Sequence, residues 1–220
     1  MSSNTKNFYT SDLHFQHHNL YTRGVRSFSC AEDCEEFIMK NFNQVIRPHD
    51  NLYILGDLSL SANYDQLASY LNSINGNKIV IMGNHDKTST LDRLKADKVI
   101  ANWHPWKGCR DHELPIFMTH FVPLEAHTGP EPRIYLHGHV HGSLKSMHCL
   151  LRYDVGVDAC DYRPFSLDTH VNLTAVRMLL DDGGFVCPVN YGSMCDICRI
   201  SLQRGAEYRA TKGVEQCLEQ

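Results

Sequence analysis

Short apolar runs that stop abruptly at polar residues recur along the first two thirds of the chain. Residues 79–82 form the clearest run, because two isoleucines, a valine and a methionine precede Gly83 without a polar interruption. A run that does not alternate between apolar and polar residues predicts a strand buried on both faces, as in a parallel sheet. Comparable short runs predict four further strands, over residues 7–11, 51–55, 115–118 and 133–136.

Apolar residues fall at helical spacing over residues 30–46 and 63–74, so both segments are predicted to be helices. Strands that alternate with helices in this way predict an α/β fold. The remaining predicted elements are a helix over residues 89–96, a strand at 99–100, closing strands over 150–157 and a last helix over 166–180, where 171–180 could instead be a strand.

Residues 102–114 show no clear period and contain both tryptophans, Trp103 and Trp106. The segment is either a loop at the mouth of a site, where an indole could stack on a ligand, or an edge strand or loop whose tryptophans cover the core. The apolar pattern leaves both interpretations open.

Each of the five predicted strands ends in aspartate, asparagine or histidine. In open α/β sheets ligands bind beyond the carboxyl ends of the strands, so these side chains are expected to converge at one edge. A single such end could be an ordinary turn in which Asn and Asp cap the next helix, but five similar ends predict a metal site. The side chains concerned are Asp12, His14, Asp57, Asn84, His85, Asp86, His120, His139 and His141.

The order of these residues resembles that of the calcineurin-like metallophosphoesterase family. The matching pieces are Asp-x-His at 12–14, Gly-Asp at 56–57, Gly-Asn-His-Asp at 83–86, Thr-His at 119–120 and Gly-His-x-His at 138–141. Four further segments resemble a small branch of that family with relatives in bacteria and phages: residues 11–19, 26–28, 155–158 and 162–164. The resemblance implies a four-layer α/β/β/α sandwich over residues 1–183, followed by a cysteine-containing extension over 184–220.

The resemblance also implies two divalent metal ions that share one carboxylate. Asp57 is the expected shared ligand, since Gly56 lets the backbone turn sharply beside it. The other ligands would be Asp12, His14 and His141 at one ion, and Asn84, His120 and His139 at the other. This mixture of oxygen and nitrogen suits manganese, iron, zinc or nickel, with manganese expected first, and the absence of thiolates argues against a structural zinc cluster.

The resemblance further implies hydrolysis of phosphate esters by a metal-bridging hydroxide, with His85 approaching the leaving-group oxygen as general acid. Asp86 could orient that imidazole, or His85 could merely contact a ligand or the backbone. Phosphodiesters or nucleotides are expected as substrates, because no large insertion is present to dock a phosphoprotein. Contacts with the phosphate are expected from the loop after the first ligands, unless that loop is simply solvated: His17, Asn19, Arg23 and Arg26.

Composition limits the partners. The 220 residues carry a formal net charge of −4 with a pI of about 6.4, which argues against a general nucleic-acid-binding surface. No apolar run approaches the roughly 20 residues that span a bilayer, and the first residues lack the apolar segment of a secretory signal. A cytoplasmic location is therefore expected, with the nine cysteines as reduced thiols rather than a disulfide framework.

Two other functions compete with a phosphoesterase. A non-catalytic scaffold on the same fold would be expected to have lost the general acid or a metal ligand, whereas every position is filled here. Alternatively, the extension could be a small zinc module that binds protein or nucleic acid. Its Cys187, Cys195 and Cys198 supply three thiolates, so a fourth ligand such as Cys217 would be needed.

Overall fold

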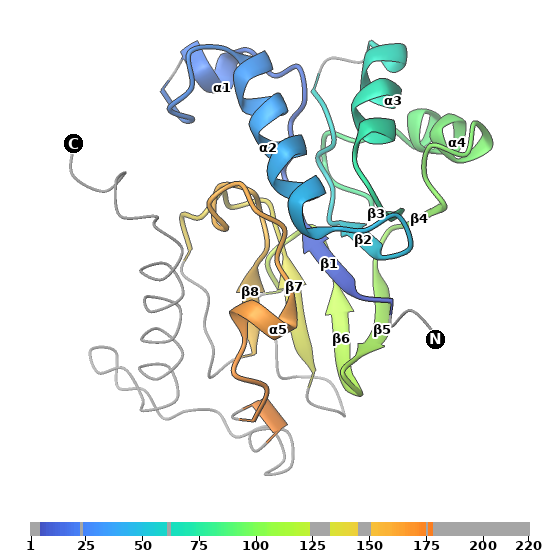
Figure 1. The fold of residues 1–220 in the computed structure, drawn as a ribbon, viewed down its shortest axis with the longest axis vertical. Helices are drawn as coiled ribbons and strands as arrows, with labels where there is room; N and C mark the ends of the chain where they lie inside the picture. The colour runs from blue at the N-terminus through green and yellow to red at the C-terminus, as the bar shows by residue number, and fades with distance from the viewer. Residues whose placement is uncertain are drawn as a thin grey trace.

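Two four-stranded sheets pack face to face in the computed structural model of the chain, with helices covering the outer face of the first sheet (Figure 1). The structure describes residues 5–22, 24–60, 63–123, 133–144, 151–174 and 176–177. The predicted α/β class and the sandwich of two sheets with helices are confirmed.

The first sheet is parallel throughout, in the order β1-β2-β3-β4. Its strands are β1 (Asn7–Thr10), β2 (Asn51–Ile54), β3 (Asn77–Ile81) and β4 (Asn102–His104). The helices that connect them are α1 (Asn19–Thr22), α2 (Ala31–Val45), α3 (Tyr64–Ser73) and α4 (Thr88–Ala96). Because the strands are parallel, the carboxyl ends of β1, β2 and β3 meet at one edge.

The second sheet is mixed, in the order β5-β6-β7-β8. It contains β5 (Lys107–Asp111), β6 (Leu114–Met118), β7 (Ile134–His137) and β8 (Arg152–Asp154), and α5 (Leu167–His170) follows it. β5 is antiparallel to β6, whereas β6, β7 and β8 are parallel. An isolated bridge between Ser11 and Gly156 ties the end of β1 to the segment after β8, so the two sheets bring their strand ends together.

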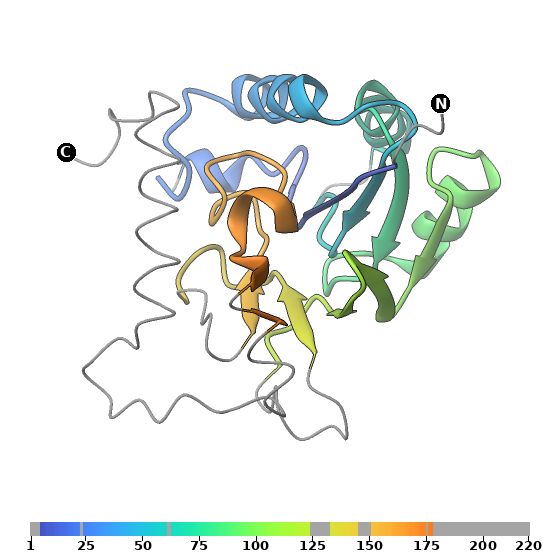
Figure 2. The same cartoon turned by 60° about the horizontal axis from the view of Figure 1, so that its bottom comes forward.

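Two apolar layers hold these elements in place. Successive side chains of β2 point to opposite faces, so Leu52 and Ile54 join one layer and Tyr53 joins the other. The first layer packs α2, α3 and α4 onto the outer face of the first sheet, as Figure 2 shows from another direction. The second layer lies between the sheets, where Tyr53 shares a cluster with Ile116 and Leu136. Burial on both faces explains why the strands of the first sheet do not alternate in polarity.

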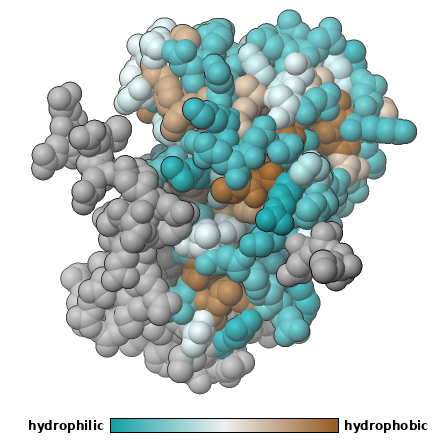
Figure 3. Space-filling model, viewed as in Figure 1, coloured by the Kyte–Doolittle hydropathy of each residue, from teal (hydrophilic) through white to brown (hydrophobic). Residues whose placement is uncertain are grey.

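The outer surface over the helices is mostly hydrophilic (Figure 3). On α2, Ile38 and Phe42 are buried one turn apart, whereas Glu36 and Lys40 are exposed. This amphipathic spacing fixes the face that α2 presents to the sheet. No helix in the described ranges is long and apolar enough to cross a membrane.

The strand predicted at residues 99–100 is wrong. α4 ends at Ala96, and Lys98 follows with a φ of 60°. The Val99 N–H then donates to the Leu94 carbonyl at 2.9 Å, so residues 99–100 belong to the cap of a helix. The strand comes three residues later, at β4, and residues 102–114 supply the edge strands of both sheets. Of the predicted last helix, α5 forms residues Leu167–His170, while residues 178–180 and the extension over 184–220 lie outside the described residues.

Candidate metal centre

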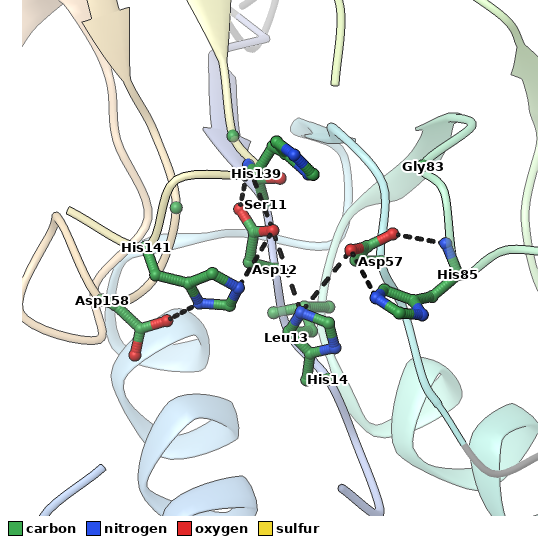
Figure 4. Close-up of polar contacts among 12 residues, drawn as sticks. Ser11, Asp12, Leu13, His14, Asp57, Gly83, His85, His139, His141 and Asp158 are labelled. Atoms are coloured by element: carbon green, nitrogen blue, oxygen red, sulfur yellow. Dashed lines mark hydrogen bonds and ion pairs between the residues drawn. The ribbon is translucent and has the colours of Figure 1, made fainter. Parts of the chain in front are cut away.

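The predicted ligands come together at the edge of the sandwich where the strands end (Figure 4). Backbone hydrogen bonds join the turn after β1 to the turn after β2: Asp12 N–H donates to Gly56 O at 3.1 Å, and His14 N–H donates to Asp57 O at 3.0 Å. The two turns therefore hold their carboxylates at a fixed spacing. β6 and β7 deliver the remaining histidines from the second sheet.

Asp12, His14 and His141 form the first ligand group, in which one potential ligand atom of each residue lies within 4.8 Å of the others. Nε2 of His14 and Nε2 of His141 each lie 3.9 Å from Oδ1 of Asp12. These separations are too long for hydrogen bonds and leave room for a cation among the three atoms. Burial raises the pKa of the Asp12 carboxyl, so a cation bound there would stabilise its ionised form.

Asp57, His120 and His139 form the second ligand group by the same distance limit. Nε2 of His120 lies 3.5 Å from Oδ2 of Asp57 and 2.8 Å from Oδ1 of Asn84, the other predicted ligand of this ion. On the far side of the ring, Nδ1–H donates to the Leu55 carbonyl at 2.7 Å. That hydrogen bond leaves the Nε2 lone pair facing the two oxygens, which is the tautomer that metal binding requires.

Asp57 lies between the two ligand groups. Its Oδ2 is 3.6 Å from Nε2 of His14 and 3.5 Å from Nε2 of His120, so one oxygen faces a histidine of each group. Its Oδ1 accepts a hydrogen bond from the His85 backbone N–H at 2.9 Å, which fixes the plane of the carboxylate. This is the position that a carboxylate shared by two ions would occupy.

The backbone adopts an uncommon conformation at the ligands. Positive φ in a non-glycine residue costs of order 1–3 kcal/mol and persists where the surrounding structure enforces it. Here φ lies between 49° and 73° at Asp12, His14, Asp57, His139 and His141. Five side chains of the two ligand groups thus project from turns that hold an uncommon backbone conformation, at the expense of local backbone energy.

Glycines allow the ligand turns to approach one another. Gly56 has a φ of +90°, and a Cβ added there would lie 2.6 Å from Gly83 Cα and 2.7 Å from Nδ1 of His120. A Cβ added at Gly138 would overlap the carboxylate of Asp12. A side chain at either position would therefore push apart the turns that carry the predicted ligands.

His14 provides the clearest test of whether the donor set fits a metal. The ring is buried, and neither of its nitrogens has a hydrogen-bond partner in the described structure, although Nε2 faces two carboxylates. Burial and the neighbouring positive groups lower the pKa of His14 to about 2, so the ring is neutral and has a lone pair to donate. Buried polar atoms are nearly always paired, and a divalent cation would satisfy this nitrogen and both carboxylates together.

Arg26 does not occupy the predicted position beside a substrate phosphate. It is 1% exposed, and its guanidinium donates to the carbonyls of Asp12 and Leu13 at 2.6 and 2.9 Å. It also makes a bidentate pair with Asp158, with Nε and Nη2 at 2.8 and 3.0 Å from the two carboxylate oxygens. Arg26 therefore braces the backbone of the first ligand turn from behind.

Asp158 is the functional residue that the ligand pattern missed. Oδ2 of Asp158 accepts a hydrogen bond from Nδ1 of His141 at 2.7 Å, which directs Nε2 of that ring toward Asp12. Hydrogen bonds from His141 and Arg26 outweigh burial and lower the pKa of Asp158, so it remains ionised. Two segments of the sequence could have indicated this residue. One is the apolar run at 155–157, which ends in Asp158, and the other is Arg26-Ser27-Phe28, which also resembles the small bacterial and phage branch of the family.

His85 lies at the exposed side of Asp57. Its side chain is 40% exposed, and Nε2 lies 3.9 Å from Oδ2 of Asp57, so the ring stands next to the Asp57 carboxylate and is accessible from solvent. Asp86 does not orient this ring in the described structure. Its carboxylate instead accepts hydrogen bonds from the backbone N–H groups of Asp57, Leu58 and Gly83 at 2.8–3.0 Å. Asp86 thus joins the turns after β2 and β3.

The other predicted substrate contacts lie at varying distances from the centre. His17 is partly exposed and its ring centroid is 5.5 Å from that of His14, so it borders the first ligand group. Asn19 is exposed at the start of α1, and Arg23 lies outside the described residues. A contact between any of these three and a substrate stays a prediction.

Two cavities among the described residues differ in size and place. The hollow beside His85 has a volume of only about 20 Å³. A larger cavity of about 520 Å³ lies at the other end of the strands, beside Asn7, Asp50 and Asp111, and none of the predicted ligands lines it.

Comparison with known proteins identifies relatives across most of the chain. The family described as calcineurin-like phosphoesterase matches residues 8–120. An uncharacterized protein of Methanocaldococcus jannaschii, MJ1445, is 31% identical over 174 residues, which cover 76% of this chain and 90% of that protein. The gene 66 protein of Mycobacterium phage L5 is 28% identical over 187 residues, covering 71% of this chain and 87% of that protein.

A solved structure supports the fold. The protein of unknown function AQ665 from Aquifex aeolicus superposes with a TM-score of 0.63 at 24% identity, covering 80% of this chain and all of that one. The family match covers Asp12, His14, Asp57, Asn84, His85 and His120, whereas His139, His141 and Asp158 lie beyond its end at residue 120.

Proposed function

The chain belongs to the calcineurin-like phosphoesterase family, whose members are typically metal-dependent hydrolases, and from this premise we propose that it hydrolyses phosphodiesters at a centre of two divalent ions. The single observation that carries the proposal is the position of Asp57, whose Oδ2 faces His14 of the first ligand group and His120 of the second. A carboxylate in that position serves two ions at once. Manganese suits the oxygen and nitrogen donors and is the ion we propose first.

Two divalent ions would supply positive charge for the phosphate and a water ionised at neutral pH. The chain itself holds the donors that such ions need. Asp12 and Asp57 contribute negative charge, while His14 contributes a neutral nitrogen that has no other partner. Backbone hydrogen bonds between the two ligand turns keep this donor set in place without a substrate.

His85 is proposed to donate a proton to the leaving oxygen. It is the histidine next to Asp57 that belongs to neither ligand group, and its exposed ring is free to move toward an ester. Its Nε2 lies 3.9 Å from Oδ2 of Asp57, which places the ring beside the centre, where a general acid is required. Asp86 contributes by fixing the turn from which His85 projects.

The substrate is proposed to be a small diester or nucleotide rather than a phosphoprotein. The sequence carries no large insertion that would dock a phosphoprotein, and a diester offers two organic groups for contacts around the centre whereas a monoester offers one. The observations favour an enzyme over a non-catalytic scaffold, since the ligands, the shared carboxylate and His85 are all in place.

The test is hydrolysis by manganese-loaded protein of three substrates: a phosphomonoester, a linear phosphodiester and a cyclic nucleotide. We expect turnover of the linear diester to exceed that of the monoester, and Asp57→Asn to abolish nearly all of it. Asp65→Asn is the matched control, because its side chain is 92% exposed on α3. Metal-loaded wild-type protein that hydrolyses none of the three would refute the proposal.

A further inference from the structure

A large aromatic side chain lies exposed against the ligands of the metal centre. Phe121 follows His120 directly, and 51% of its surface is accessible to solvent. Its ring centroid is 5.1 Å from that of His120 and 5.0 Å from that of His139, at interplanar angles of 76° and 62°. An aromatic ring that is exposed beside two ligands is available to stack on a planar group of a bound substrate.

Phe121 and His85 contact histidines of different ligand groups. His85 stands by Oδ2 of Asp57 and contacts the ring of His14, whereas Phe121 contacts His120 and His139 of the second ligand group. A leaving group that receives a proton from His85 must lie beside His85. The organic group that Phe121 can reach is therefore the other substituent of the phosphate, which stays on phosphorus after cleavage.

We propose that Phe121 determines specificity by stacking on a planar group, such as a nucleobase, of the substituent that the phosphate retains. This inference rests on the proposed phosphodiesterase function and deepens it. A phosphomonoester has no retained organic group, so the contact would favour diesters over monoesters. Base–aromatic stacking tolerates different bases, so the contact would select nucleosides as a class rather than one sequence.

The proposal is tested with two diesters that share a leaving group. Thymidine 5′-(p-nitrophenyl phosphate) and methyl p-nitrophenyl phosphate both release p-nitrophenolate, but one retains a nucleoside and the other a methyl group. Alanine substitution of a stacking aromatic typically weakens binding of a base by about 5- to 150-fold. We expect Phe121→Ala to lower kcat/KM for the thymidine ester by a factor in that range, mainly through KM, and to leave the methyl ester unchanged.

Further variants separate stacking from support of the ligands. Phe121→Leu keeps an apolar contact with the two imidazoles but cannot stack, and it should resemble Phe121→Ala, whereas Phe121→Trp should retain the preference. Trp106→Ala is the matched control, because Trp106 is 60% exposed but stacks on Phe117 rather than on a ligand. Metal content should stay unchanged in all of these variants.

Binding provides a readout independent of turnover. Calorimetry with thymidine 5′-phosphate and with methyl phosphate should show that Phe121→Ala weakens the first ligand alone. Equal losses for both esters and both ligands would overturn the proposal and reduce Phe121 to a support for His120 and His139. A different result would refute the proposed phosphodiesterase function itself: metal-loaded wild-type protein that hydrolyses neither ester.

Discussion

The substitution Asp158→Asn isolates the support behind the first ligand group. The change preserves shape but replaces one carboxylate oxygen by an NH₂ group. Asp158 now accepts hydrogen bonds from Nδ1 of His141 at one oxygen and from Arg26 at both. Whichever way the amide turns, its NH₂ faces a donor, because Arg26 cannot accept and Nδ1 of His141 carries a proton when Nε2 is to bind a metal.

The expected effect has two parts of different size. Loss of a residue that orients a metal-bound histidine typically costs 10–100-fold in metal affinity or activity, which corresponds to about 1.4–2.8 kcal/mol. The buried charge of Arg26 also loses its ion-pair partner. Removing one partner of a buried pair costs about 3–5 kcal/mol, and this is an upper limit here because an amide oxygen still accepts from the guanidinium.

Metal affinity, kcat/KM and the midpoint of urea unfolding separate the two parts. Titration against a competing chelator should show weaker binding at the first ligand group, and unfolding of the metal-free protein should show the Arg26 contribution alone. Asp65→Asn serves again as the control, because an exposed ion pair contributes about 0–1 kcal/mol. The reasoning is refuted if Asp158→Asn binds metal and turns over substrate as the wild type does.

Three further predictions follow from the centre. His85→Asn should retain its metals and lose about 10²–10⁴-fold on an alkyl ester, with a much smaller loss on a p-nitrophenyl ester, which needs no proton; equal losses measured on both would argue against a general acid. Gly138→Ala should weaken metal binding and stability, because the added Cβ would overlap Ser11 and Asp12. Gly108→Ala is the control and should do neither, because the nearest atom to its added Cβ lies 3.8 Å away. Similar metal content and melting temperature in the two variants would contradict this prediction. Chelation of the metals should lower the melting temperature of the wild-type protein, because an ion present at 100 times its Kd contributes about 2.7 kcal/mol to the free energy of unfolding. An unchanged melting temperature would speak against metal binding by the folded state.

The parts of the structure that follow local rules could be predicted from the sequence. The first three strands of the first sheet were recognisable because burial on both faces removes alternation, and the ligands were recognisable because they lie within a few residues of a strand end. α2 was recognisable for a similar reason, since its buried positions recur once per turn. In each case the signal and the structure lie within one short stretch of chain.

The parts that depend on distant contacts could not be predicted. A basic residue in a loop near the ligands suggests a contact with phosphate. Only the folded structure shows that Arg26 instead pairs with Asp158, which is 132 residues away in sequence. Asp86 stands beside a histidine in sequence, yet its carboxylate binds backbone of the neighbouring turn. Residues 99–100 have the composition of a strand, but the end of α4 recruits them as a cap, which apolar pattern alone does not distinguish.

The central claim is that Asp57 is shared by two ions, and anomalous diffraction from crystals of the manganese-loaded protein tests it most directly. The account predicts two manganese peaks about 3.5–4 Å apart, one at the first ligand group and one at the second, with the Asp57 carboxylate touching both. A single peak, or two peaks of which only one contacts Asp57, would contradict it.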